Sequence, residues 1–290
     1  DFLLRNRAGR SDFILACGGG VTSDLVGYAA ATAMRGIRWG IVSTTLLGMV
    51  DAAIGGKTGI NHRLGKNLIG AFWQPTFVLG DLSFLQTLPR REMVAGLGEI
   101  LKYAGLAGGQ MPAKVDRYLE QDDLYCERLL LPLIRRSVAY KAKVVAEDER
   151  ETNRRAVLNL GHTFAHAIEN AGRYSALLHG EAVIVGLLAA VELSCRTRPR
   201  SAKYLEPYRR LITKTMRYLP HRRISIDRVL SAMQFDKKRV GEKMRFVLLT
   251  KPGDPHISSE IAARDVEASL ESALKVYQSY GGRHAPHTDR

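Results

Sequence analysis

The chain has 290 residues, 46% of them hydrophobic and 25% charged, and its formal net charge is +14 at pH 7. This composition is ordinary for a soluble globular enzyme of one or two domains. No apolar run approaches the ~20 residues that a membrane span needs, and the first residues lack the apolar core of a signal peptide. Three widely spaced cysteines, Cys17, Cys126 and Cys195, argue against a disulfide framework or a thiolate zinc site. We therefore expect a cytoplasmic protein without membrane contacts, in which histidine and carboxylate side chains would hold any metal.

The first ninety residues alternate between strand-like and helix-like segments. Strands are predicted at the apolar runs 12–17, 37–44 and 77–82. A helical stretch follows the first run after three glycines, and a short helix with a glycine-rich segment precedes the third run. This alternation predicts a parallel α/β layer.

From about Arg90 onward, helical periodicity dominates. Helices are predicted over Glu92–Leu106, Leu129–Val145, Leu158–Ala171, Gly180–Cys195 and Ile261–Tyr277, with one strand-like run at 244–250. The predicted fold class is thus α/β followed by mainly α: a partial Rossmann-like nucleotide-binding domain over 1–89 and a helical domain over 90–290. Three apolar runs make only part of a dinucleotide-binding sheet, so we expect an amino-terminal piece to be missing.

The segment GGGVTSD, residues 18–24, joins the first strand to its helix. Such a turn can let the backbone approach a pyrophosphate at a helix N-terminus. It is not a GxGxxG fingerprint, because Ser23 stands where the third glycine belongs. A tight strand-to-helix turn without a ligand explains the segment about as well.

The segment GGKTG, residues 55–59, imitates the end of a P-loop. The first glycine of that motif would fall on Asp51, which excludes the nucleoside triphosphatase reading. Lysines and asparagines nevertheless crowd this part of the chain, at Lys57, Asn61, Lys66 and Asn67. They could bind phosphate and carboxylate oxygens, or they could form an ordinary solvated loop.

The segment LNLGHTFAHAIEN, residues 158–170, carries two histidines four residues apart. If a helix runs from Arg155 to Asn170, one face collects Arg155, Asn159, His162, His166 and Glu169. The apolar side chains fall on the other side of this helix. A helix face of this composition is more typical of the lining of a binding cleft than of a surface exposed to solvent.

Two further residues can complete a metal site with these histidines. His179 begins the next helix, and Glu99 is followed one turn later by Lys102. Two histidines and a carboxylate with an open position are a standard catalytic zinc arrangement. The spacing does not fix which three residues bind the ion. HExxH is absent, which excludes a zincin-type protease.

Much of the positive charge lies between Arg196 and Arg223. This stretch could attract nucleic acid or phosphate, but it matches no helix-turn-helix, zinc-finger or RNP pattern. We favour a solvated helical face and do not expect a nucleic-acid partner. Salt-sensitive binding of duplex DNA would support the alternative.

Several motifs in succession resemble those of the 3-dehydroquinate synthase family. They are GGGVTSDLVGY, RGIRWGIVSTTLLGMVDAAIGGKTGINHRLGKNLIGAFWQP, FLQTLPRREMVAGLGEILKY, KAKVVAEDERETNRRAVLNLGHTFAHAIE and LLHGEAV. The resemblance runs collinearly from about residue 12 to residue 190, and a weaker similarity follows at FDKKRVGEKMRFVLL.

The resemblance implies a lyase of the shikimate pathway, which leads to chorismate and the aromatic amino acids. The family converts 3-deoxy-D-arabino-heptulosonate 7-phosphate to 3-dehydroquinate and phosphate by transient oxidation, phosphate β-elimination, reduction and aldol cyclisation. It uses NAD and a divalent metal, zinc or cobalt, and works as a homodimer on an anionic sugar phosphate. The departing phosphate acts as its own base, so no dedicated protein base is required.

The resemblance also implies roles for individual residues. The metal ligands fall on Glu99, His162 and His179. NAD contacts fall on Gly19, Gly20, Val21, Asp24, Thr44, Thr45, Lys57, Lys66, Thr87 and Leu88. Substrate contacts fall on Asp51, Lys57, Asn67, Lys102, Lys141, Arg155, Asn159 and His166, with Lys237 or Lys238 in addition. Arg35 would reach the site of the partner subunit.

The chain departs from the family pattern at Ser23 and Ala165, where glycine is usual, and in the connection ENAGRYSALLHGE. The opening strands of the family, which hold the adenosine half of NAD, are absent, so we expect weak NAD binding or none, and tight binding in calorimetry would contradict this. Three alternatives stay open: another sugar-phosphate cyclase of the 2-epi-5-epi-valiolone or 2-deoxy-scyllo-inosose synthase type, a metal-dependent polyol dehydrogenase, and a truncated inactive homologue.

Overall fold

A computed structural model describes the chain except residues 63–64, 122, 174, 241–243 and 281–290, and it describes only the backbone at 65–66 and 234–240. The chain forms two compact units. Unit 1 comprises Asp1–Gly96 and Tyr125–Glu151, and unit 2 comprises Leu97–Leu124 and Thr152–Arg290. The domain boundary predicted at residue 89 stays a prediction, because compact units are not the same as independently folding domains. The compact units differ from it because residues 125–151, which follow that point, belong to unit 1.

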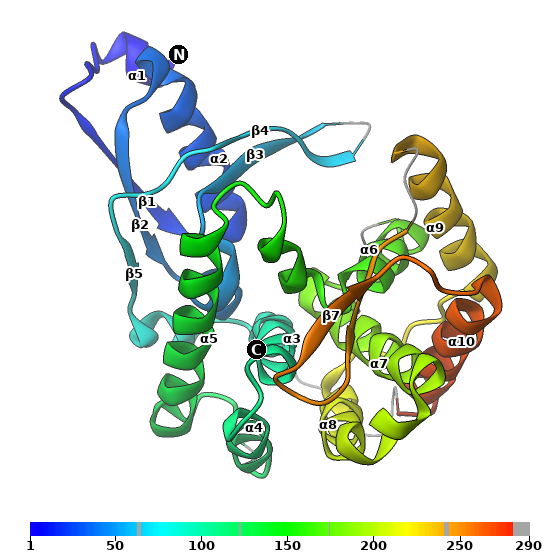
Figure 1. Cartoon of the computed structure of the whole chain (residues 1–290). Coiled ribbons are helices and arrows are strands. Elements are labelled where there is room, and N and C mark those ends of the chain that lie inside the picture. Colours follow the sequence, from blue (N-terminus) through cyan, green and yellow to red (C-terminus); the bar gives the residue numbers. More distant parts are fainter. Residues whose placement is uncertain (63–64, 122, 174, 241–243, 281–290) are drawn as a thin grey trace. The chain divides into compact units, whose positions relative to one another are not determined.

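Unit 1 is built around a short parallel sheet in the order β1-β2-β5. Its elements are α1 (Phe2–Arg5), β1 (Phe13–Gly18), α2 (Gly20–Thr32), η1 (Ala33–Arg35), β2 (Arg38–Ser43), η2 (Gly48–Ala52), β3 (Lys57–His62), β4 (Gly65–Phe72), β5 (Val78–Gly80), η3 (Leu82–Thr87) and α5 (Glu127–Glu147). Helix α2 lies against β1 and β2 (Figure 1). Their common core contains Ala16, Ala30, Trp39, Ile41 and Ala53. The three predicted apolar runs are therefore the three strands of this sheet.

The glycine-rich segment after β2 differs from its prediction. It forms an antiparallel hairpin, β3 with β4, in which Gly59 faces Gly70. A side chain on Gly70 would come within 2.3 Å of the Thr58 carbonyl oxygen, so the two strands can approach this closely only with glycine there. The hairpin was not predicted because glycine and polar residues give it no alternating apolar pattern.

Helix α5 belongs to unit 1 and is amphipathic. Its buried positions recur every three or four residues: Leu130, Leu133, Ile134, Ser137, Lys141, Val144 and Val145. Lys141 thus occupies a core position on a helix face whose other residues are apolar or small. A buried ammonium group requires a partner.

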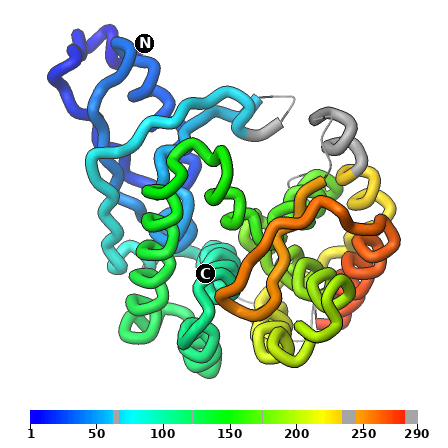
Figure 2. Tube along the Cα trace, viewed as in Figure 1, coloured from blue at the N-terminus to red at the C-terminus, as the bar shows by residue number. Residues whose placement is uncertain are grey.

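In its described residues, unit 2 is helical apart from one two-stranded sheet. Its elements are the end of α3 (Arg90–Ala107), whose first turns belong to unit 1, then α4 (Met111–Leu119), η4 (Arg154–Asn159), α6 (His162–Ala171), α7 (His179–Thr197), η5 (Pro199–Ser201), α8 (Ala202–Thr215), η6 (Met216–Tyr218), α9 (Ile226–Val240), β6 (Phe246–Leu249), β7 (Pro255–Ser258) and α10 (Ala263–Tyr280). The strand predicted near 244–250 is β6, which pairs with β7. Figure 2 follows this unit from the green helix α6 to the orange-red helix α10.

Helix α7 is the centre of unit 2. Its residues from Gly180 to Val191 are all buried, as expected of a helix that is apolar on every side. Helices α6, α8 and α10 and strand β6 pack around it. Within the described residues, no helix combines the length and the apolar character that a membrane crossing requires.

The basic stretch 196–223 forms η5, α8 and η6. Helix α8 buries Leu205, Tyr208, Leu211 and Ile212 on one side, while Arg209 pairs with Glu192 at 2.6 Å and Lys214 with Asp116 at 2.8 Å. Its cations therefore lie on the partly solvated side of an amphipathic helix, in agreement with the favoured interpretation.

Candidate metal centre and active site

Three chain segments of unit 2 bring Glu99, His162 and His179 together. Glu99 lies in α3, His162 is the first residue of α6, and His179 is the first residue of α7. One suitable donor atom from each of the three lies within 4.8 Å of the others. The structure thus unites the three residues that the resemblance assigns to a metal.

Two close backbone contacts between helices set this arrangement. A side chain on Gly98 would come within 2.1 Å of the Gly180 carbonyl oxygen, so glycine lets α3 approach the start of α7. Gly161 has φ of +78° and lies against α7, where a side chain on Gly186 would come within 2.3 Å of the Gly161 carbonyl oxygen. Each contact lies beside a candidate ligand in the sequence.

The left-handed Gly161 also changes the predicted helix over 155–170. Arg155 and Asn159 lie in the 3-10 helix η4, and α6 begins only at His162. The prediction of one continuous helix was therefore wrong. His162 is buried, as is Glu169, so the polar face is in part enclosed by protein.

The distances within the cluster suit a cation. Glu99 Oε1 lies 3.5 Å from His162 Nε2 and 3.5 Å from His179 Nε2. Tetrahedral coordination with bonds of about 2.0–2.1 Å separates two ligand atoms by roughly 3.3–3.4 Å. The observed separations are long for hydrogen bonds and close to those across a shared ion.

The carboxylate of Glu99 carries the strongest sign that a positive group belongs there. The residue is fully buried, and neither oxygen takes part in a hydrogen bond of good geometry. Lys102 Nζ lies 2.5 Å from Oε2, so it neutralises charge without a well-directed hydrogen bond. Burial would raise the pKa of Glu99, but Lys102 and His162 hold it well below its usual range. A buried anionic oxygen facing two imidazoles is suited to a divalent cation.

Both histidines present the same nitrogen to Glu99. His162 Nδ1 lies 3.1 Å from the Leu160 carbonyl oxygen, and His179 Nδ1 lies 3.0 Å from Glu169 Oε2. Burial opposes a charge on His179, but its hydrogen bond to Glu169 and the nearby negative charge of Glu99 raise its pKa to about 10. A cation bound by this imidazole would therefore displace a proton.

The substrate residues predicted in unit 2 lie near this cluster or in the segment that leads to it. The ring of His166 lies 5.5 Å from that of His162 and 6.0 Å from that of His179, and the side chain is exposed. Arg155 is buried and Asn159 is half-buried, both in η4. Lys102 is also buried and contacts Glu99.

A second group of predicted residues converges in unit 1. Lys141 Nζ donates to the Asp51 backbone oxygen at 2.7 Å and lies 3.1 Å from Asp51 Oδ2. Asp24 is near both. Its pKa rises to about 6, because burial raises it and the Asp51 charge adds to this, while Lys141 opposes the shift. Asp51, in η2, is therefore a partner of the buried lysine in α5.

The turn between β1 and α2 carries the predicted contacts with the phosphates of a dinucleotide. A side chain on Gly18 would come within 2.4 Å of Thr22 Oγ1, and one on Gly19 within 2.9 Å of Thr45 Cγ2. Only glycine therefore fits against the Thr22 and Thr45 side chains in this turn, and the helix N-terminus that follows is a kind of site that binds anions. Ser23 fits in place of the usual glycine because its hydroxyl donates to the Gly20 carbonyl oxygen at 2.8 Å.

The remaining predicted contacts lie at separate places in unit 1. Lys57 is exposed and paired with Glu151. Asn67 has φ of +52°, Arg35 has φ of +64°, and both are exposed. The other members of the set lie at the first turn of α2, just after β2 and at the end of η3: Gly20, Val21, Thr44, Thr45, Thr87 and Leu88. The side chains of Lys66, Lys237 and Lys238 lie outside the described residues.

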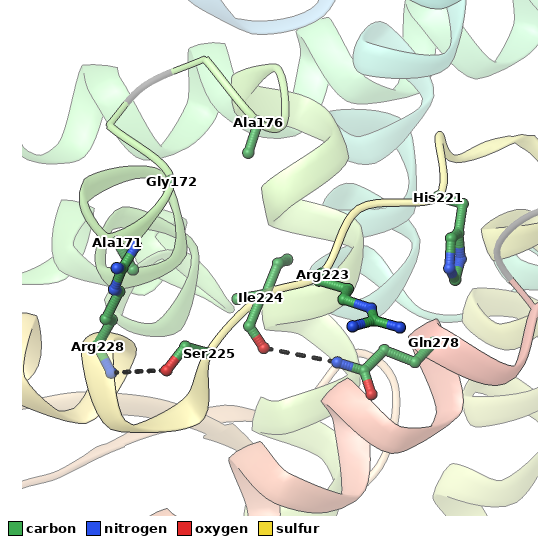
Figure 3. A pocket seen from close by; sticks show the side chains of 9 residues that line it. All are labelled: Ala171, Gly172, Ala176, His221, Arg223, Ile224, Ser225, Arg228 and Gln278. Carbon is green, nitrogen blue, oxygen red and sulfur yellow. Dashed lines mark hydrogen bonds between the residues drawn. The ribbon is translucent and has the colours of Figure 1, made fainter.

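A cavity of about 660 Å³ lies elsewhere in unit 2 (Figure 3). It is lined by Ala171, Gly172, Ala176, His221, Arg223, Ile224, Ser225, Arg228 and Gln278. None of these residues belongs to the predicted site. The cavity is therefore no evidence for the metal centre.

Sequence reasoning missed two carboxylates. Glu169 was predicted to lie on the helix face that carries the histidines, but no role was predicted for it, and it contacts His179. Glu151 was not predicted to belong to the site, and it pairs with Lys57. Helical spacing was a signal for Glu169, because it follows His162 by seven residues and His166 by three. We found no sequence signal for Glu151.

Comparison with known proteins identifies the family. The family model described as 3-dehydroquinate synthase N-terminal matches residues 1–95, and the one described as 3-dehydroquinate synthase C-terminal matches residues 96–239. The 3-dehydroquinate synthase of Nitrosospira multiformis is 46% identical over 266 residues, covering 91% of this chain and 72% of the relative. That of Acinetobacter baylyi is 43% identical over 270 residues, covering 93% and 75%.

Solved structures agree in fold. A 2-epi-5-epi-valiolone synthase from Streptomyces hygroscopicus, with NAD+ and Zn2+ bound, has a TM-score of 0.85 at 28% identity, covering 95% of this chain and 77% of that one. A 2-deoxy-scyllo-inosose synthase complexed with carbaglucose-6-phosphate, NAD+ and Co2+ has a TM-score of 0.82 at 25% identity, covering 93% and 76%. The predicted fold class is confirmed. With relatives above 40% identity along most of its length, this chain belongs to the 3-dehydroquinate synthase family.

Proposed function

We propose that this protein converts 3-deoxy-D-arabino-heptulosonate 7-phosphate to 3-dehydroquinate and phosphate, using NAD and one divalent cation. The observation that carries the proposal is the convergence of Glu99 Oε1, His162 Nε2 and His179 Nε2 in unit 2. The family membership selects this reaction among those that such a site could support. The proposal includes a cytoplasmic homodimer, with Arg35 reaching the site of the partner subunit, and zinc or cobalt as the ion.

The metal and the dinucleotide supply chemistry that side chains lack. When bound, a cation held here would supply Lewis acidity toward a substrate hydroxyl, and NAD would supply reversible hydride transfer. The contribution of the chain is to hold both. Glu99, His162 and His179 would bind the cation, and the turn at Gly19 and Gly20 would receive the pyrophosphate, with the other NAD contacts as predicted.

The polar residues around these sites would bind an anionic sugar phosphate. In unit 2, Arg155, Asn159 and His166 offer a buried guanidinium, an amide and an exposed imidazole. In unit 1, Asp51 holds the Lys141 ammonium group in place at a buried position. Fixed cations of this kind position phosphate and stabilise developing negative charge. Lys57, Asn67, Lys102 and Lys237 complete the proposed set.

Activity with defined substrates tests the proposal. Purified protein with NAD and Zn2+ or Co2+ is expected to release phosphate from the heptulosonate 7-phosphate and to form 3-dehydroquinate, with no net production of NADH. Glu99→Gln and His162→Ala should reduce kcat/KM at least about 100-fold, because loss of a ligand weakens cation binding. His221→Ala, a histidine outside the cluster, serves as the control.

The alternatives give different products. Turnover of sedoheptulose 7-phosphate in preference to the heptulosonate would contradict the proposal in favour of a valiolone-type cyclase. Net NADH production from a polyol would indicate a dehydrogenase. A folded protein that binds the cation but turns over neither sugar phosphate would indicate an inactive homologue.

A further inference from the structure

A second buried carboxylate stands behind the candidate metal ligands. Glu169 lies in α6 and is only 4% exposed, and its Oε2 is 3.0 Å from His179 Nδ1. His179 begins the next helix, so this contact joins the last turn of α6 to the first turn of α7. Helices α6 and α7 also pack on each other along their lengths. The position of Glu169 is therefore fixed by the core and not by solvent.

The contact decides which nitrogen of His179 is available to a cation. A carboxylate accepts hydrogen bonds, so the Nδ1 proton points to Glu169. The lone pair of neutral imidazole is then on Nε2, the atom that faces Glu99 Oε1 at 3.5 Å. Without an acceptor at Nδ1, the ring could rotate or adopt the other tautomer, and Nε2 would then carry a proton instead of a lone pair.

His162 shows the same arrangement with a different acceptor. Its Nδ1 lies 3.1 Å from the Leu160 backbone oxygen. Both imidazoles are thus oriented with Nε2 toward one carboxylate oxygen, but only His179 depends on a side chain for this. A substitution can remove the orienting group of His179 and leave that of His162 in place.

We infer that Glu169 is the positioning residue of the metal centre: it holds His179 with Nε2 directed at the cation and increases the basicity of that ligand. The inference rests on the proposed metal site and extends it to a residue that does not touch the ion. Carboxylates behind metal-bound histidines typically contribute 10- to 100-fold in metal affinity, so about this loss is expected on removal of Glu169.

The same atoms permit one other arrangement. His166, Glu169 and His179 also offer donor atoms within 4.8 Å of one another. A cation there would be bound by Glu169 itself together with the two imidazoles. In that case Glu169 would be a ligand of a second ion, and the protein would bind two cations instead of one. Stoichiometry distinguishes the two roles.

The test measures Co2+ binding to the metal-free full chain by competition with a chromophoric chelator, together with the visible spectrum of bound Co2+. Wild type is expected to bind one ion. Glu169→Ala should bind it 10- to 100-fold more weakly with an altered spectrum, and Glu169→Gln, which keeps size and a hydrogen-bond acceptor, should lose less. Glu192→Gln removes a carboxylate from the same helix as His179 and should bind like wild type.

The possible outcomes distinguish failure of the positioning role of Glu169 from failure of the proposed metal site. Wild-type binding with both Glu169 variants unchanged within about threefold would overturn the positioning role but leave the metal site intact. Two ions in wild type and one in Glu169→Ala would assign Glu169 as a ligand instead. A wild-type protein that binds no ion would overturn the metal site, and the positioning role with it. Since Glu169→Gln conserves volume, its result stands even if the alanine variant does not fold.

Discussion

At the scale of single residues, several ionisable side chains occupy buried positions. An apolar side chain at such a position would carry no cost of removing a charge from water. Lys141 takes a core position of α5 next to Asp51, and Lys102 and Glu99 are both buried in α3. Buried charges seldom improve stability over well-packed apolar residues. Their presence is therefore better explained by chemistry than by folding, as is often true of strongly perturbed groups.

Asp24 gives a pH-dependent prediction. Its pKa in the folded chain is about 6 against an ordinary value of 3.8, so the folded state binds more protons than the unfolded state between these pH values. Stability contributed by the protonated form is therefore lost as pH rises from about 4 to above 6. Asp24→Asn should not show this loss.

Urea unfolding of both proteins at pH 4.5 and pH 7.5 measures the difference. The difference in the free energy of unfolding, Asp24→Asn minus wild type, should be larger at pH 7.5 than at pH 4.5 by on the order of 1 kcal/mol. This figure is reduced because Asp24 is partly exposed to solvent. Other titrating groups cancel in this comparison. A difference that stays constant with pH, or that favours wild type at pH 7.5, would contradict the assignment.

At the scale of elements, glycine contacts between helices place the ligands. Gly98 meets Gly180, and Gly161 meets Gly186, in each case where a side chain would clash with a carbonyl oxygen or with the backbone of a facing helix. Packing this close leaves little freedom for the ends of α6 and α7. The candidate ligands are thus positioned by the rigid part of unit 2.

Gly161→Ala tests this arrangement. The backbone has φ of +78° there, and the added atom would lie 2.9 Å from Leu187 N. The left-handed conformation alone costs an alanine about 1–2 kcal/mol, and the contact adds to this. We expect a loss of at least that size in the free energy of unfolding, together with weaker Co2+ binding.

Gly9→Ala is the matched control, because no atom outside its immediate neighbours lies within 4 Å of the added group. It should change stability by no more than about 0.5 kcal/mol, as is usual for surface substitutions. If Gly161→Ala is as stable as this control, the tight contact at the start of α6 is not required.

Some of these elements could be predicted from sequence, and others could not. The strands β1 and β2 and the helices α5 and α7 follow from continuous or periodic apolar patterns. The break at Gly161 could not be predicted, because the residues on both sides continue the helical pattern and only packing against Gly186 favours the left-handed conformation. The contact between Glu169 and His179 likewise depends on how α6 packs on α7, which spacing along one helix does not show.

At the scale of the whole molecule, the predicted site residues fall into two groups. The group around Glu99 belongs to unit 2, and the group of Asp24, Asp51 and Lys141 belongs to unit 1. Each is brought together by the core of its own unit. The candidate ligands Glu99, His162 and His179 therefore all belong to unit 2, and cation binding by them can be tested without substrate or NAD.

Anomalous diffraction from crystals grown with Zn2+ tests this centre most directly. Difference maps from data recorded at the zinc absorption edge should show one strong peak per chain, about 2.0–2.2 Å from Glu99 Oε1, His162 Nε2 and His179 Nε2. A peak bound by His166 and Glu169 instead, or no peak among these side chains in a well-ordered crystal, would contradict the account.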